Sequence, residues 1–164
     1  QVMAHKKLKQ WLIKIYTEDH PESPHAWQKY VHRCLGARTA SLSIKTRGYE
    51  KHFAVPKKYI YPLPYPSTGP FLLVVERLPV YSHSDNKKIW RSGIVSKKVL
   101  KEFYDILNDA GLADCCMIDN AAWGTNRKIN LIDTEHHHMW PPAYYKLTRY
   151  LPSKLQGYWQ EIAH

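Results

Sequence analysis

Apolar positions between Ser96 and Gly111 recur at the spacing of an α-helix. Ser96 can cap the start of such a helix, and Gly111 suits a left-handed residue at its end. The apolar residues that share one face are Val99, Leu100, Phe103, Ile106, Leu107 and Ala110. The pattern predicts an amphipathic helix between the two capping residues.

The N-terminal part gives weaker patterns. In residues 3–16, Leu8, Trp11, Leu12 and Ile15 fall at near-helical spacing with lysines between them, which predicts a basic amphipathic helix broken by residues 17–25. That helix would pack on its own domain or on an anionic membrane or partner. Residues 27–35 fit a strand or a helix, and 37–48 predict a short helix that Gly48 ends.

Prolines at 56, 62, 64, 66 and 70 exclude a long helix or a central strand, so residues 52–70 are expected to be extended chain and loop. The apolar run "FLLVVERL" at 71–78 then predicts a strand buried on both faces. Residues 81–93 predict a loop with a short helix.

Past the central helix, the pattern predicts a hairpin. Residues 112–124 indicate a loop that leads into a short strand, "GTNRK" a turn, and "INLID" a second strand. Residues 141–164 predict two short helices separated at Pro152.

Composition narrows the class of protein. With 164 residues, 44% hydrophobic and 23% charged, the chain suits one globular domain, and no segment fits a transmembrane helix. A formal charge of +10 favours polyanionic partners such as nucleic acid, anionic membrane, nucleotide phosphates or an acidic protein, or is simply a basic surface.

Three cysteines, Cys34, Cys115 and Cys116, give no disulfide framework. We therefore expect a reducing, intracellular setting, namely the cytoplasm, with the adjacent pair buried as small hydrophobic residues. Because the sequence begins with Gln1, we expect it to be a trimmed piece of a longer chain.

Oxygen ligands gather in the second half. Asp133 ends the predicted strand, and Asp114 and Asn120 lie in the loop before the hairpin, where they could hold Mg²⁺ or simply form turns. Three histidines follow at 136–138. Alternate side chains of a strand face opposite ways, so we expect them to contact phosphate or substrate rather than converge on one metal ion.

This order of elements and acids resembles the catalytic half of the protein-kinase-like fold over residues 55–135. The resemblance implies Asp114 as the catalytic base and Asn120 and Asp133 as magnesium ligands, with Asp133 opening a DFG-type motif written Asp-Thr-Glu. Asp119 is the alternative metal ligand, because it has the five-residue spacing of the family's loop, whereas Asn120 lies six positions after Asp114.

The resemblance implies an α+β fold in one domain over 1–164. A reduced, β-containing N-terminal lobe and hinge would occupy 1–78, and a mainly helical C-terminal lobe 79–164. Backbone groups at Glu76, Arg77 and Leu78 would bind adenine. With 30–36 as a strand, Arg33 would take the place of the phosphate-binding lysine, and the Gly-rich loop of kinases is missing from the sequence.

The resemblance further implies an ATP- and Mg²⁺-dependent phosphotransferase acting on a hydroxyl of a protein or small molecule. Two other functions are open. One is a catalytically inactive pseudokinase that serves as a binding module. The other is a basic nucleic-acid-binding protein, indicated by aromatic residues interleaved with lysine and arginine, as in "PAYYKLTRY".

Overall fold

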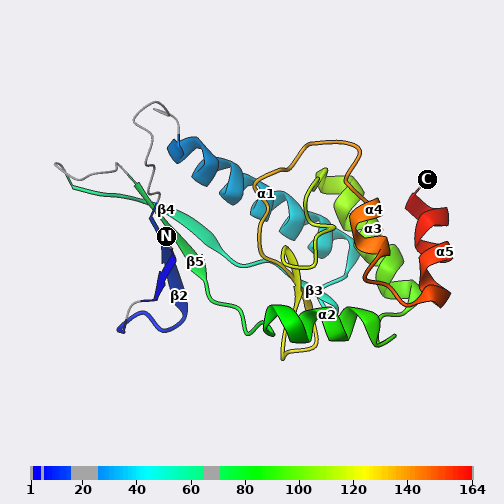
Figure 1. The fold of residues 1–164 in the computed structure, drawn as a ribbon. Coiled ribbons are helices and arrows are strands. Elements are labelled where there is room, and N and C mark those ends of the chain that lie inside the picture. The colour runs from blue at the N-terminus through cyan, green and yellow to red at the C-terminus, as the bar shows by residue number, and fades with distance from the viewer. Residues whose placement is uncertain (1, 5, 16–25, 65–70, 164) are drawn as a thin grey trace.

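The computed structural model describes residues 2–4, 6–15, 26–64 and 71–163. Over these ranges the chain forms an α+β fold in which a four-stranded sheet lies at one end and most helices at the other (Figure 1). The strands are β1 (Val2–Ala4), β2 (Trp11–Lys14), β3 (Phe53–Ala54), β4 (Lys58–Pro62), β5 (Phe71–Glu76), β6 (Ala121–Trp123) and β7 (Ile129–Leu131). The helices are α1 (Ala26–Arg47), α2 (His83–Arg91), α3 (Lys97–Ala110), α4 (Tyr145–Thr148) and α5 (Ser153–Ala163).

The four-stranded sheet is antiparallel, in the order β1-β2-β5-β4. The helix expected over residues 3–16 is wrong, because this segment contains strands β1 and β2. Pairing explains the difference: Leu12 lies opposite Val75 and Ile13 opposite Val74, so the apolar run extends the sheet. The expected break at 17–25 lies outside the described residues.

Strand β5 is a central strand of this sheet, as its apolar run predicts. Burial on both faces is wrong, because Leu73 and Val75 are buried while Leu72 and Val74, which alternate with them, are only half-buried. The buried pair packs with Tyr30 of α1 in a small apolar cluster. Proline-rich β4 is an edge strand, as its prolines require.

Helix α1 is continuous from Ala26 to Arg47, so the strand expected over 30–36 is wrong. Its polar and apolar residues are mixed because its two ends pack on different partners. Tyr30 contacts the sheet cluster, whereas Ala40 and Ile44 belong to the larger core around α3. Gly48 ends the helix with φ of 72°, as predicted.

The larger core forms around α3, whose Ser96 and Gly111 caps are confirmed. The hairpin β6–β7 is also confirmed, and β3 joins it as a parallel third strand.

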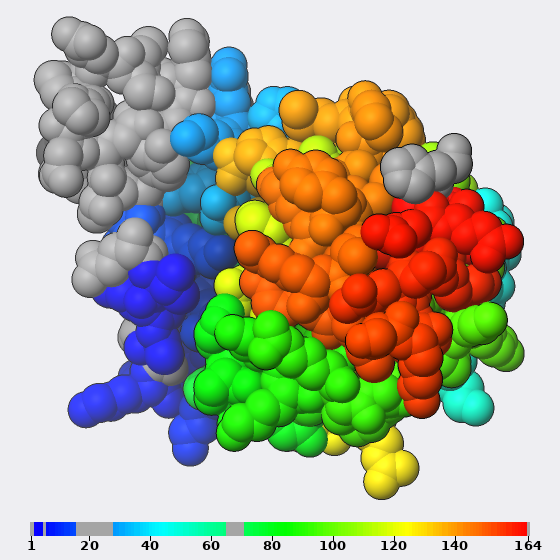
Figure 2. All heavy atoms as spheres, turned by 45° about the vertical axis from the view of Figure 1, so that its right-hand side comes forward, coloured from blue at the N-terminus to red at the C-terminus, as the bar shows by residue number. Residues whose placement is uncertain are grey.

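Helices α4 and α5 flank Pro152 as predicted. Figure 2 shows α2 (green), the segment around α4 (orange) and α5 (red) on one face. No helix within the described ranges is long and apolar enough to cross a membrane.

Candidate functional site

The loop before the hairpin and the segment after it enclose a cavity of about 240 Å³. The residues that line it are Asp114, Met117, Asn120, Asp133, Glu135 and His136. The structure therefore brings together three of the residues singled out in the sequence, Asp114, Asn120 and Asp133.

Hydrogen bonds fix this loop against the end of β7. The backbone N–H of Ile132 donates to the carbonyl of Asn120 at 2.8 Å, and the thiol of Cys115 donates to the carbonyl of Asp133 at 3.0 Å. The Asn120 amide also donates to the backbone carbonyl of Asp114 at 3.1 Å. The backbone that carries all three residues is thus tied together by local bonds.

The carboxylate of Asp114 contacts the side chains of His136 and Lys146. His136 Nδ1 lies 2.5 Å from Asp114 Oδ2, and Lys146 Nζ donates to Oδ1 at 3.2 Å. Burial raises the pKa of Asp114, but the hydrogen bonds of these two side chains outweigh it and leave that pKa below its ordinary value. Asp114 is therefore ionised at neutral pH and held in one orientation.

Asp119 lies apart from this group. Its side chain is 62% exposed and pairs with His83 at the start of α2. It lines the neighbouring cavity, not the cavity of Asp133. Of the two alternative metal ligands, Asn120 is the one that lines the same cavity as Asp133.

A second cavity of about 210 Å³ lies between the sheet and the hairpin. Its lining is mostly apolar and includes Leu12, Val75, Leu78 and Ile132. Of the three expected hinge residues, Glu76 and Leu78 line it, whereas Arg77 is absent from the lining and its N–H donates to the carbonyl of Gln10. An apolar slot beside an extended backbone segment suits a flat, aromatic ligand.

Lys14, at the end of β2, lines the same cavity and is a residue that the sequence analysis missed. Burial lowers the pKa of Lys14, and the charge of Arg33 lowers it further, against the opposing effect of Asp133 and Glu135. A signal was present, since "WLIK" is an apolar run of strand length that ends in lysine. The helical spacing of apolar residues across residues 3–16 favoured a helix instead, so this strand and its lysine were not predicted.

Arg33 belongs to α1 and not to a strand, so it does not occupy the position expected for a strand lysine. Its Nε and Nη2 donate to Glu135 Oε2 at 2.8 and 2.7 Å. Nη2 also lies 3.4 Å from Asp133 Oδ2. Arg33 therefore extends from helix α1 to Asp133, the candidate metal ligand.

The three histidines do not converge. His136 contacts Asp114, while His137 packs against His32 with ring centroids 5.7 Å apart. In the part of the chain that the structure describes, no three His, Cys, Asp or Glu side chains are placed to hold a metal ion. Cys115 and Cys116 are buried as expected, and burial raises the pKa of Cys116 to about 12.

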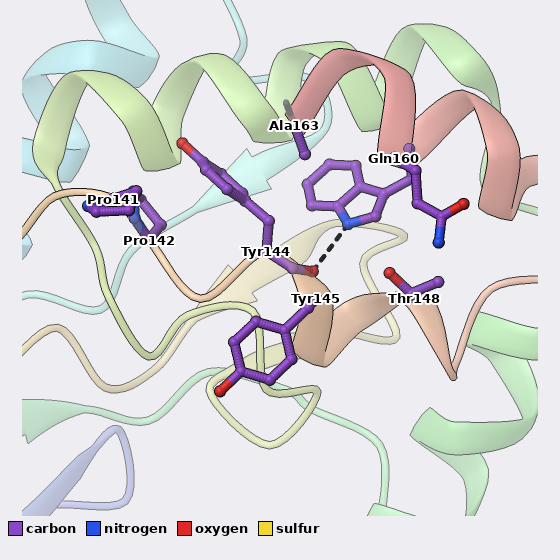
Figure 3. A pocket seen from close by; sticks show the side chains of 8 residues that line it. Pro141, Pro142, Tyr144, Tyr145, Thr148, Gln160 and Ala163 are labelled. Carbon is purple, nitrogen blue, oxygen red and sulfur yellow. Dashed lines mark hydrogen bonds between the residues drawn. The ribbon is translucent and has the colours of Figure 1, made fainter.

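A third cavity, of about 250 Å³, lies between α4 and α5 and is drawn in Figure 3. Its lining contains no charged side chain and is formed by Pro141, Pro142, Tyr144, Tyr145, Thr148, Trp159, Gln160 and Ala163. The Trp159 indole donates to the carbonyl of Tyr144 at 2.9 Å (Figure 3). This hollow offers apolar surface but no acid, base or metal ligand.

The first two cavities are lined by consecutive residues just after β7. Ile132 lines the apolar cavity, and the next residue, Asp133, lines the acidic one. The two cavities together offer an apolar part, a lysine and oxygen ligands. No family model matches the chain, and neither the curated proteins nor the solved structures include a match to it.

Proposed function

We propose that this chain is a divergent protein-kinase-like domain that binds ATP with Mg²⁺ and transfers the terminal phosphoryl group to a hydroxyl acceptor. The observation that supports it most directly is that consecutive residues, Ile132 and Asp133, line an apolar cavity that holds Lys14 and a second cavity that contains Asp114 and Asn120. Phosphoryl transfer from ATP needs a pocket for the adenine ring, a cation that binds the phosphates, ligands for the metal ion and a carboxylate beside the acceptor hydroxyl.

The metal would be held by Asp133 and the amide oxygen of Asn120. Two protein ligands suffice for Mg²⁺ at a nucleotide site, because phosphate oxygens and water complete its octahedral shell. The absence of three converging protein ligands among the described residues is compatible with this kind of site.

The adenine ring would enter the apolar cavity beside Glu76 and Leu78, which places the phosphates toward Asp133. Lys14 lines the apolar cavity, on the strand next to β5, and lies close enough to Asp133 and Glu135 for their charges to act on it. Its ammonium is the cation that would bind the α- and β-phosphates. This assignment replaces Arg33, whose guanidinium is engaged by Glu135.

Asp114 would orient the acceptor hydroxyl and take its proton as the phosphoryl group moves. The paired His136 and Lys146 keep it ionised, as a base requires. The bond that breaks joins the γ-phosphorus to its bridging oxygen, and the bond that forms joins this phosphorus to the acceptor oxygen.

The first test is thermal unfolding with ATP and Mg²⁺, each alone and both together. We expect the midpoint to rise only when both are present, because a ligand that binds the folded state alone stabilises it by about 2.7 kcal/mol at 100 times its Kd. Asp133→Asn should remove that response. The matched control is Asp85→Asn, an exposed carboxylate on α2 that lines neither cavity.

A radiolabelled phosphotransfer assay with protein and small-molecule hydroxyl acceptors follows. Binding with no transfer would identify an inactive nucleotide-binding module, the pseudokinase alternative. An unchanged midpoint in all conditions would count against the nucleotide site itself.

A further inference from the structure

The Asp-Thr-Glu segment is anchored to helix α1 through the Thr134 hydroxyl and to β4 through Lys58. The Thr134 hydroxyl donates to the carbonyl of Arg33 at 3.0 Å. From the other side, Lys58 donates to the carbonyl of Ile132 at 2.8 Å and to the Thr134 hydroxyl at 2.9 Å. These bonds hold the chain in place without any contribution from the Arg33 guanidinium.

The Arg33 guanidinium is therefore available to act on the carboxylates. It donates twice to Glu135 and lies 3.4 Å from Asp133 Oδ2. The side chains of Arg33, Asp133 and Glu135 are 22, 31 and 18% exposed. Water screens this group only in part, so the charges interact more strongly than on an open surface.

A second cation completes the cluster. Lys14 lies near both carboxylates, yet within the described ranges it makes no ion pair with either of them. Glu135 is taken by Arg33, and Asp133 is bonded to the backbone N–H of Glu135 at 3.2 Å. The ammonium thus remains free to meet a phosphate.

We infer that Arg33 and Glu135 are a positioning pair that orients Asp133 for the metal and prevents both carboxylates from forming an ion pair with Lys14. In protein kinases a helix glutamate pairs with the strand lysine. Here the helix supplies the cation and the Asp-Thr-Glu segment supplies the carboxylate, so the charges are inverted. This inference rests on the proposed Mg²⁺–ATP site.

Removing one partner should release the other onto the site. Without Arg33, Glu135 is free to pair with Lys14 and withdraw it from the phosphates. Without Glu135, Arg33 is free to close the 3.4 Å gap to Asp133 and compete with Mg²⁺. Removing both eliminates both competitors, so the double variant should recover part of what each single variant loses.

The experiment is a double-mutant cycle with Arg33→Met, Glu135→Gln and the double variant, measured as the calorimetric Kd for ATP with and without Mg²⁺. We expect each single change to raise the Kd for Mg²⁺–ATP about tenfold. The Kd of the double variant should rise by less than the product of the two single increases. Arg33→Met should weaken ATP binding without Mg²⁺ as well. Glu135→Gln should mainly reduce the gain that Mg²⁺ brings, a readout that a general loss of stability would not change.

The control is Arg47→Met, because Arg47 lies on the same helix but pairs with Asp109 of α3, away from both cavities. Unfolding midpoints identify variants that fail to fold. If the wild-type chain binds Mg²⁺–ATP but the effects of the two single changes are absent or simply add in the double variant, the positioning pair alone would be overturned. Failure of the wild-type chain to bind Mg²⁺–ATP would overturn the proposed function, and this inference with it.

Discussion

The side-chain amide of Asn120 donates a 3.1 Å hydrogen bond to the backbone carbonyl of Asp114. The two residues are six positions apart, so this bond closes the loop between them. Because the Asn120 carbonyl also accepts from Ile132, the same residue joins the loop to the end of β7. Its side chain lines the same cavity as Asp133.

Asn120→Ala should abolish the dependence of ATP binding on Mg²⁺ and should lower the free energy of unfolding by about 1 kcal/mol, since one hydrogen bond is lost. Asp119→Ala should leave the Mg²⁺ dependence nearly unchanged, because the Asp119 carboxylate pairs with His83 outside the cavity that Asp133 lines. Magnesium titrations of both variants, followed by ATP binding, measure this. The reverse result would make Asp119 the ligand.

Lys146→Met should raise the pKa of Asp114, because it removes one of the two side chains whose hydrogen bonds lower that pKa. The acidic limb of the kcat/KM profile should then move to higher pH. Lys45→Met, which removes an exposed lysine that lines neither cavity, is the control. A limb that stays in place in both variants would show that Asp114 does not govern it.

Gly36→Ala should destabilise the fold by about 3 kcal/mol. A Cβ at this position in α1 would overlap the backbone carbonyl oxygen of Thr134, so helix and Asp-Thr-Glu segment would have to separate. Gly157→Ala in α5 meets no atom within 4 Å and should stabilise by about 0.5–1 kcal/mol. Urea unfolding of both variants compares them, and an equal response would contradict close packing at Gly36.

The ammonium of Lys58 should make stability depend on pH. Burial lowers its pKa from 10.5 to about 8 in the folded chain. Between these values the unfolded chain binds a proton that the folded chain does not, so raising the pH stabilises the fold. The gain is absent below the folded pKa and complete above the unfolded one.

Across this range we expect the wild-type free energy of unfolding to rise relative to Lys58→Met by on the order of 3 kcal/mol. Urea unfolding of both chains from pH 7 to 11 gives the difference and cancels other titrating groups. A constant difference would mean that Lys58 keeps its ordinary pKa.

Local patterns determined a large part of this fold. Helix α3 follows from its apolar stripe and its caps, Ser96 and Gly111, because each contact in the pattern lies within a few residues. The hairpin of β6 and β7 follows from two apolar runs around a turn, and it delivers Asp133 beside Asn120. The grouping of Asp114 with Asn120 and Asp133 was expected from the resemblance of the loop and hairpin to a known fold, and the three residues do line one cavity.

Tertiary structure decided the N-terminal half. Residues 11–14 have helical spacing but form a strand, because β5 offers a partner whose position the sequence does not reveal. Lys14 enters the site only through that pairing. Arg33 and Glu135 lie 102 residues apart, so their contact depends on how α1 packs against the Asp-Thr-Glu segment. Short-range spacing predicts which elements form, whereas only packing between distant elements brings these charges together.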